Sequence, residues 1–429
     1  MAKKVDVLLD EEELEIIAAT TGRAPVQLPG RVASVFPALT HRNYQFYFAG
    51  QITSLMGFWL QLVGQGFLVF QLTHSAFWVG TVAALGGLPT LFLTSWAGVL
   101  IDKVDTRKLL SWILIVQALL ALILGLTVLL GVATVELIII LAVLTGIAGA
   151  IDLPTRQTFV VELVGKKDLA SAISVNVGIF NSARFVGPAL AGILIATVGV
   201  GWTFIFNALS FLPIIFFLTK IKPLKFEELE ANLHPFTMLK QGIKFVFTHE
   251  RLLWLTLLAS ATGLFNWPHQ TLMPVVAEKI YGAGASGLGS LLSAAGAGSL
   301  LGALFTSTQR SRKERSGLII AGALISSLSL MLFGFNHNFF LAHLLLFFAG
   351  LGLIIQVANI NTTVQTLAPD QMRGRVMGVY LTMFVGLMPI GNALAGILAE
   401  RTSSLFTISL GGFILFIFSS FLYWRGYIK

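Results

Sequence analysis

The chain has 429 residues, of which 56% are hydrophobic and 11% are charged, and its mean hydropathy is +0.85. This composition is too apolar for a soluble domain and indicates a membrane protein. The absence of cysteine excludes disulfides and thiol catalysis. The sequence has no phosphate-binding loop of the form GxxxxGK(S/T), so we expect no ATPase. We also expect no cofactor and no metal, because the seven histidines lack metal-ligand spacing.

Residues 1–42 contain no apolar run long enough for a signal peptide and carry an acidic cluster at positions 10–13, so we expect a largely disordered cytoplasmic tail. Twelve apolar runs follow, each near the roughly 20 residues that a helix needs to cross a bilayer. They lie approximately at 44–72, 77–101, 109–130, 135–160, 169–198, 202–219, 252–276, 288–305, 317–335, 339–365, 376–398 and 405–424. Such continuous runs fit helices better than barrel strands. We predict an all-α membrane protein with twelve transmembrane helices.

The basic residues are concentrated in the tails and in the loops after even-numbered runs. Of the 28 Lys and Arg residues, only Lys279 and Arg401 fall on the opposite side, and Arg184 lies inside a run. Basic loops stay in the cytoplasm. We therefore expect a multi-pass protein of the inner (plasma) membrane with both termini cytoplasmic. The net charge of +8 then reflects topology, and we expect no binding to nucleic acid.

A motif is repeated within the chain: residues 187–194 read GPALAGIL and residues 391–398 read GNALAGIL. The two copies fall in the fifth and eleventh runs, which indicates duplication of a six-helix module. We predict an N-terminal bundle over 43–219, a cytoplasmic central loop over 220–251 and a C-terminal bundle over 252–429. The GIKFVFTHERLL end of the loop is expected to form an amphipathic helix on the membrane surface.

The repeated motif supplies small residues, which let two helices approach closely in lipid. The glycines that we assign to helix packing are Gly187, Gly192, Gly391 and Gly396. Pro188 is the one difference between the copies, and it is expected to kink the fifth helix, whereas Asn392 leaves the eleventh intact. The alternative is ordinary helix packing with a tolerated proline.

Several motifs together resemble the major facilitator superfamily over about residues 42–425. GVLIDKVDTRK (98–108) is similar to the superfamily's signature loop, although Val104 and Asp105 replace small residues. ELVGKKDLASA (162–172), ARFVGPALAG (183–192) and PDQMRGRVMG (369–378) are similar to the exporter branch that includes enterobactin exporters and macrolide efflux proteins. The resemblance implies two six-helix bundles that alternate access to a central site. It also associates the fifth-helix motif with export.

Polar residues inside membrane spans are costly, so they are functional candidates. The resemblance implies that helices one, four, seven and ten line the central cavity. The candidates for a substrate cavity are Gln61, Gln65, Asn266, Trp267, His269, Gln270, Gln356 and Asn359, with Asn361 also polar. The alternative for each amide is an interhelical hydrogen bond. For His269 the alternative is a satisfied side chain beside Pro268.

Asp152 is the candidate for proton coupling. It lies ten residues before Glu162, so it is roughly 15 Å deeper in the membrane if Glu162 marks the end of the helix. Arg156 is one turn away, and Arg184 is the other basic residue embedded deeply enough to compete for the carboxylate. A moving cation would change the proton affinity of a buried acid. The alternative is a static ion pair.

The resemblance also implies a cytoplasmic gate, made of Gly98, Asp102, Arg107, Lys108, Glu162, Arg373 and Arg375. We expect Asp102 to lie against the start of the eleventh helix and to meet Arg373 or Arg375. Arg107 is expected to pair with Glu162. The alternative is that these charges are simply solvated loop residues.

These features predict a monomeric secondary transporter that exchanges protons for an amphiphilic organic compound such as a drug, macrolide or siderophore. Its partners would be that small molecule, protons and the lipid bilayer. An uptake symporter or a lysophospholipid flippase of the same fold is the alternative. A membrane enzyme is the least supported reading of the sequence.

Overall fold

The computed structural model describes residues 36–101, 104–221, 235–307, 312–369 and 371–428. Helices make up nearly all of these residues, and no strand occurs among them. The tail expected over residues 1–42 lies largely outside the described residues. The part that is described is a short helix, η1 (Pro37–Thr40), followed directly by the first long helix.

The N-terminal half contains α3 (Arg42–Thr73), α4 (Ala76–Ile101), α5 (Thr106–Leu129), α6 (Val135–Val198) and α7 (Val200–Lys220). The C-terminal half contains α8 (Pro235–Thr248), α9 (Glu250–Ala261), η2 (Thr262–Asn266), α10 (Pro268–Val275), η3 (Val276–Ile280), α11 (Gly284–Ser307), α12 (Arg312–Phe333), α13 (Phe339–Leu367), α14 (Arg373–Val385), α15 (Met388–Arg401) and α16 (Ser404–Arg425). Eleven helical segments in the described ranges are long and apolar enough to cross a membrane. The prediction of an all-α membrane fold is confirmed.

The seventh expected span is the one that falls outside this set of eleven, because it is divided into α9, η2, α10 and η3. Both η2 and η3 are π-helical turns. Pro268 follows η2 and has no N–H to donate to the Leu264 carbonyl one turn earlier, and a helix adapts to such a gap by local widening. The backbone at the junctions stays right-handed helical, so the four pieces form one continuous helix.

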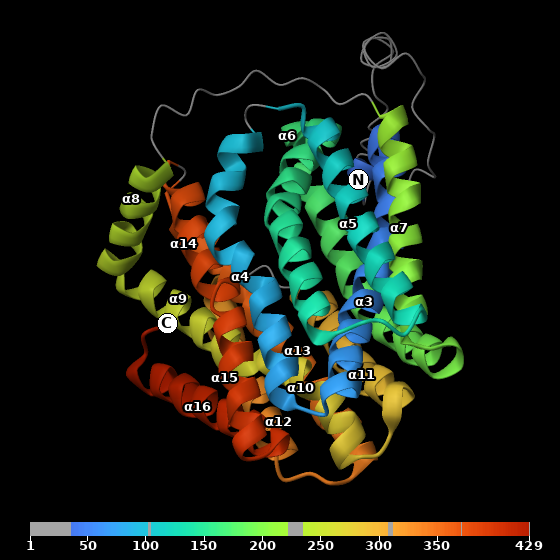
Figure 1. Cartoon of the computed structure of the whole chain (residues 1–429). Helices are drawn as coiled ribbons and strands as arrows, with labels where there is room; N and C mark the ends of the chain where they lie inside the picture. Colours follow the sequence, from blue (N-terminus) through green and yellow to red (C-terminus); the bar gives the residue numbers. More distant parts are fainter. Residues whose placement is uncertain (1–35, 102–103, 222–234, 308–311, 370, 429) are drawn as a thin grey trace, which may run out of the picture.

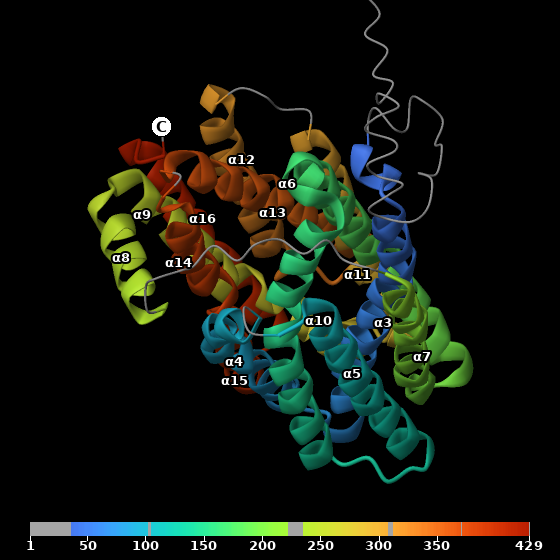
Figure 2. The same ribbon diagram turned by 90° about the horizontal axis from the view of Figure 1, so that it is seen from above.

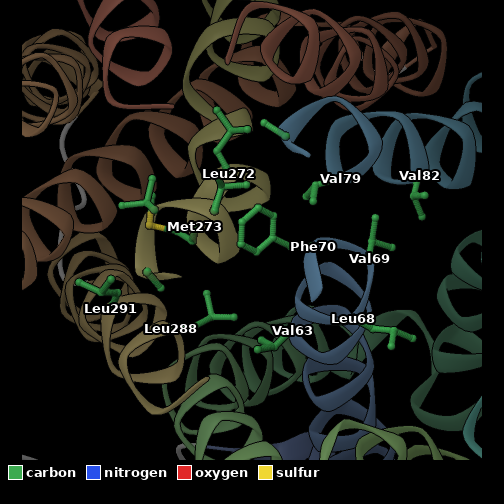
Figure 3. Close-up of a cluster of buried hydrophobic side chains, with 14 of the residues drawn as sticks. Val63, Leu68, Val69, Phe70, Val79, Val82, Leu272, Met273, Leu288 and Leu291 are labelled. Atoms are coloured by element: carbon green, nitrogen blue, oxygen red, sulfur yellow. The ribbon is translucent and has the colours of Figure 1, made fainter. Parts of the chain in front are cut away.

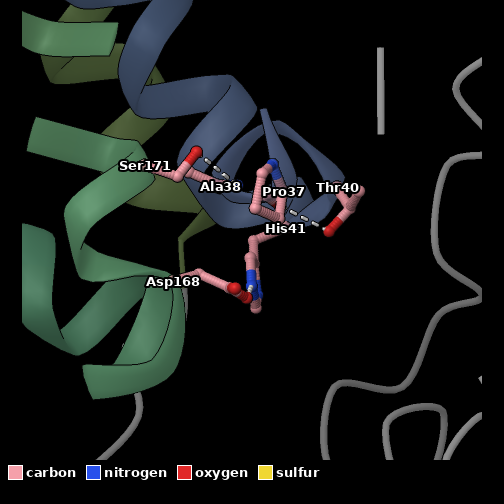
Figure 4. A network of polar contacts seen from close by, with 6 residues as sticks. All are labelled: Pro37, Ala38, Thr40, His41, Asp168 and Ser171. Atoms are coloured by element: carbon pink, nitrogen blue, oxygen red, sulfur yellow. Dashed lines mark hydrogen bonds and ion pairs between the residues drawn. The ribbon is translucent and has the colours of Figure 1, made fainter. Parts of the chain in front are cut away.

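The fourth and fifth spans are joined as α6, which has two arms, Val135–Gly165 and Lys167–Val198. The chain turns at Gly165, whose φ of 71° and ψ of 174° suit a residue without a side chain. Gly165 is the only position in α6 with non-helical dihedral angles, so the backbone dihedrals stay helical at Pro188. Two polar contacts join η1 and the residue after it to the second arm of α6. His41 Nε2 lies 2.7 Å from Asp168 Oδ2, and Ser171 Oγ accepts from the N–H of Ala38 (Figure 4).

The two halves lie side by side (Figures 1 and 2). We call the face with the α4–α5 connection and Gly165 the basic face, and the opposite face, with the connections at 73–76 and 129–135, the distal face. The helix expected over GIKFVFTHERLL (242–253) is present but divided, because α8 ends at Thr248 and His249, in an extended conformation, begins α9. α8 packs on α14 through Gly242 against the Arg375 carbonyl. Its place on the membrane surface stays a prediction.

The hydrophobic core is divided in a way that distinguishes the two faces. Near the basic face, one buried cluster belongs only to residues 38–221 and another only to residues 246–428. Towards the distal face, a single cluster combines side chains of both halves, with Phe70 beside Leu272 and Met273 (Figure 3). The halves are therefore joined at the distal face and have separate cores at the basic face.

The repeated motif forms this distal junction twice. A Cβ on Gly192 in α6 would lie 2.9 Å from the Cα of Gly289 in α11. A Cβ on Gly396 in α15 would lie at the same 2.9 Å from the Cα of Gly80 in α4. Real Cβ contacts do not reach such distances, so each glycine permits direct backbone contact between the halves.

The first glycine of each copy makes the equivalent contact within its own half. Gly187 packs against the Trp59 side chain of α3, and Gly391 packs against the Leu264 backbone of η2. The motif therefore recurs because each half needs one small-residue contact to its own first helix and one to the other half. The motif and its contacts repeat with the same pattern in the two halves.

We expect Gly192→Val to disfavour closure of the distal face, because overpacking a tight contact costs about 1–3 kcal/mol. Gly178→Val is the matched control, since it lies on the same arm and a Cβ there meets nothing within 4 Å. The chain has no cysteine, so spin labels can be placed at Val132→Cys and Phe335→Cys, which are exposed distal positions of opposite halves. Pulsed electron resonance should show longer label distances for Gly192→Val only. An unchanged distribution would contradict the role of this contact.

Candidate functional site

Asp152 and Arg156 form an ion pair within the first arm of α6. Arg156 Nε lies 2.7 Å from Asp152 Oδ2. The Arg156 side chain is 13% exposed and the Asp152 side chain is 16% exposed. The four-residue spacing places both on one face of the helix. Arg156 also donates to Gln51 Oε1 on α3 and to the hydroxyl of Tyr47. The ion pair is thus held between the first and fourth spans.

The Asp152 carboxylate is only partly satisfied by this cluster. Its Oδ1 atom is buried and has no hydrogen-bond partner in the part of the chain that the structure describes. Asp152 lies thirteen residues from Gly165 and seventeen from Val135, so it is near the middle of its arm. Neither Tyr47 nor Gln51 was among the sequence candidates, although Gln51 is a polar residue inside the first apolar run.

Arg184 does not share the Asp152 carboxylate. Its guanidinium carbon lies 5.3 Å from the centre of the Trp267 ring, across the junction between α6 and the divided seventh span. Arg184 is 3% exposed, and within the described ranges it forms neither an ion pair nor a hydrogen bond from its guanidinium. Trp267 also meets Phe384 of α14 edge-on. Arg184 therefore does not compete with Arg156 for the Asp152 carboxylate in this structure.

The polar candidates of the first and seventh spans fall into two groups. Gln61 accepts a hydrogen bond from Asn207 of α7, and Asn266 donates to Ser326 Oγ at 2.7 Å. Both are therefore engaged in interhelical bonds inside their own halves. Gln65 is partly exposed and makes no hydrogen bond among the described residues. Gln270 lies three residues beyond Trp267, and its buried Nε2 has no partner in the described ranges.

The remaining candidates are buried within the C-terminal half. His269 Nδ1 donates to the Asn266 carbonyl at 2.6 Å. Gln356 donates to Thr262 Oγ1 at 2.6 Å, and Asn359 donates to a carbonyl of its own helix. Asn359 is 2% exposed and Gln356 is fully buried. The Gln356 contact therefore joins the seventh and tenth spans, whereas the contacts of His269 and Asn359 stay within their own spans.

The gate residues are only partly described. Asp102 lies outside the described residues, and Gly98 lies in α4. Arg107 donates to the Ile221 carbonyl at 2.9 Å, while Glu162 accepts from Thr106 Oγ1 at 2.7 Å, so the expected pair of Arg107 with Glu162 is not formed. A backbone carbonyl at the end of α7 is simply nearer to the guanidinium.

The other basic residues of the expected gate lie at the basic face. Lys108 donates its backbone N–H to Asp105 Oδ1, which caps α5. Arg373 donates to the Gln365 carbonyl at 3.1 Å, and Arg375 donates to Gln241 on α8. Arg375 therefore ties the eleventh span to the central loop.

The distal face carries a contact that the sequence did not reveal. Glu400, at the end of α15, accepts hydrogen bonds from the N–H groups of Ala76 and Phe77 at 2.7 and 3.2 Å and from Ser75 Oγ at 3.1 Å. A carboxylate at a helix N-terminus is favourable. Lys279 extends the same link, with its Nζ 5.5 Å from the centre of the Phe70 ring. We call Glu400 and Lys279 the distal latch, because both belong to the C-terminal half and contact the N-terminal half.

When the divided helix from Glu250 to Ile280 is counted as one span, each half has six spans. Two such halves define a transporter of the major facilitator fold, and we call the glycine contacts between α6 and α11 and between α4 and α15 the seam. The sequence profile described as transmembrane secretion effector matches residues 33–426. The chain belongs to this family of the major facilitator superfamily. It is a transporter and not an enzyme.

Three characterised relatives match most of the chain. The staphyloferrin A transporter of Staphylococcus aureus is 26% identical over 86% of this chain and 92% of its own length. The multidrug efflux pump Tap of Mycolicibacterium fortuitum is 29% identical over 81% and 87%. The enterobactin exporter EntS of Shigella flexneri is 26% identical over 88% and 90%. The expected link to the exporter branch is confirmed.

Solved structures share the fold. The nucleoside transporter NupG, as a D323A mutant, superimposes with a TM-score of 0.69 at 14% identity, over 89% of this chain and 98% of NupG. A bacterial homologue of the lysosomal transporter Spinster gives 0.68 at 12% identity, over 92% and 96%. At these identities the likeness establishes the fold alone.

We expect Glu400→Ala to weaken distal closure, because it removes the carboxylate that caps α4. A charge at a helix N-terminus contributes about 1 kcal/mol, which corresponds to about a fivefold change in the ratio of the two states. The measurement is the distance between the labels at Val132→Cys and Phe335→Cys. Glu136→Ala is the control, because Glu136 is an exposed distal carboxylate in the first turn of α6. Equal distributions in both variants would exclude the latch.

Proposed function

We propose that this transporter exports an amphiphilic organic compound, such as a drug, macrolide or siderophore, in exchange for protons. The observation that carries the proposal is the division of the core: the halves share one cluster at the distal face and have separate clusters at the basic face. A rocking carrier needs such a junction on one side at a time. Relatives named for efflux and export support the direction.

The distribution of basic residues supports a cytoplasmic basic face, with both termini on that side. In this orientation the described state is closed to the outside, by the glycine seam and the distal latch. Export then requires the seam to separate while Gly98, Asp102, Arg107, Lys108, Glu162, Arg373 and Arg375 approach one another at the basic face. The rearrangement replaces one set of contacts between the halves by another.

Proton coupling is assigned to Asp152 with Arg156. A carboxylate near the middle of a span, with one oxygen bound by a cation and the other without a partner among the described residues, has the features of a proton-binding group. Protonation of Asp152 would release Arg156, which also holds Gln51 of α3. The protonation state is thereby linked to the contact between the first and fourth spans, which is the type of connection that a coupled carrier requires.

The direction and the cargo can be tested in vesicles of both orientations from cells that produce the chain. Ethidium, 1-naphthylacetamide and 1-naphthylacetate provide amphiphilic probes of positive, neutral and negative charge. Export predicts accumulation of at least one probe in inside-out vesicles with an acidic interior. Accumulation only in right-side-out vesicles would favour the uptake symporter. Movement of lysophospholipid but of no probe would favour the flippase.

We expect Asp152→Asn to abolish gradient-driven accumulation while exchange of cargo across the membrane survives, because the substitution mimics a permanently protonated carboxyl. The loss should exceed tenfold, since a carrier without the coupling group cannot use the gradient. The measurement is proton-driven transport and counterflow of the same probe in proteoliposomes. Glu136→Gln is the control outside the cluster. Gradient-driven accumulation at the wild-type level in Asp152→Asn would assign Asp152 a structural role.

A further inference from the structure

Arg184 is a buried cation that has no counter-charge among the residues that the structure describes. We propose that Arg184, with Trp267 and Gln270, forms a recognition site for the oxyanion of an aromatic or otherwise apolar organic acid. The proposal rests on the transport of an organic compound proposed above and specifies the class of that compound as anionic. It assigns Arg184 to the cargo and leaves the proton to Asp152.

The first argument is the missing counter-charge. Arg184 is 3% exposed, and its Nη2 atom is buried with no hydrogen-bond partner among the described residues. Arg156, by comparison, is surrounded by Asp152, Gln51 and Tyr47. A buried cation without a partner strongly destabilises a protein unless something supplies the opposite charge. An anionic ligand would supply it.

The second argument is that the neighbouring groups cannot supply that charge. Trp267 offers a ring face, which attracts the guanidinium but leaves its N–H groups free. His269 interacts electrostatically with Arg184, yet its Nδ1 already donates to the Asn266 carbonyl, and an imidazole is neutral or positive. No carboxylate in the described ranges lies within salt-bridge distance.

The third argument is the nature of the other unsatisfied group. Gln270 follows Trp267 by three residues, about one helical turn, and its Nε2 is a buried donor without a partner in the described ranges. An oxyanion attached to a flat apolar body would suit these two donors, Arg184 Nη2 beside the indole ring and Gln270 Nε2 about one turn along the helix from Trp267. Phe384, edge-on to Trp267 with ring centres 6.2 Å apart, adds a second aromatic surface.

The site also has the position that a carrier needs. Arg184 belongs to the N-terminal half, whereas Trp267 and Gln270 belong to the C-terminal half. The backbone of Arg184 packs against Gly296 of α11, and its side chain contacts Trp267, so both lie at the contact between the two halves. A ligand that binds both groups would contact both halves, and rocking would change its contacts.

The test is calorimetric binding of 1-naphthylacetate and of its neutral amide, 1-naphthylacetamide, to the purified full chain at neutral pH. We expect the wild type to prefer the carboxylate by about tenfold or more, the difference that hydrogen bonds to a charged group supply. Arg184→Gln should bind the two probes with affinities within about twofold of each other. Arg184→Lys, which keeps the charge, should retain part of the preference. Arg425→Gln, an exposed site, is the charge control and should behave as the wild type.

Three results would overturn the proposal. The first is a wild type without preference for the carboxylate over the amide, and the second is an undiminished preference in Arg184→Gln. The third is that inorganic phosphate displaces labelled 1-naphthylacetate as effectively as unlabelled 1-naphthylacetate does. Retained binding of the amide by Arg184→Gln shows that this variant is folded. Binding is measured without a gradient. Loss of transport with intact carboxylate preference would therefore contradict the proposed export and leave this site in place.

Discussion

The close approach of glycine-bearing helices at the distal face is the constraint on which the described state depends. Helices in lipid gain little from hydrophobic burial against each other, so their association relies on packing of small residues and on hydrogen bonds. Gly192 with Gly289, and Gly396 with Gly80, bring the two halves into backbone contact. The cluster around Phe70 combines side chains of both halves at the same face. Glycine has no side chain, so these backbone contacts themselves involve no rotamer that would have to change if the junction opened.

The charged residues inside the spans differ in whether their contacts lie within one half or between the two halves. Asp152 and Arg156 lie within one arm of α6 and form an ion pair, so both partners belong to the same half. Arg184 lies on the seam and meets Trp267 of the opposite half, so its surroundings depend on how the halves are arranged. The proposed proton site inside one half and the proposed ligand site between the halves would be the two parts that coupled exchange requires.

Local geometry explains which features were predictable from sequence. The four-residue spacing of Asp152 and Arg156 determines their contact on any helix, and apolar runs determine where helices lie. Glu400, by contrast, meets Ala76, which is 324 positions away, and only the packing of the two halves brings them together. The same holds for Arg184 with Trp267. The division of the seventh span was missed because hydropathy does not report where prolines widen a helix.

The single difference between the motif copies gains a meaning from these contacts. Pro188 has no N–H, so the Arg184 carbonyl one turn earlier lacks its usual helical partner and lies against Gly296 of α11. In the other copy, Asn392 keeps its N–H, and its side chain accepts a hydrogen bond from Thr271 at 3.0 Å. The eleventh span is thus hydrogen-bonded to the seventh within its own half, whereas the fifth packs through the Arg184 carbonyl against α11 of the other half. The proline therefore leaves a backbone carbonyl without its helical partner at the residue whose guanidinium we propose to bind the transported compound.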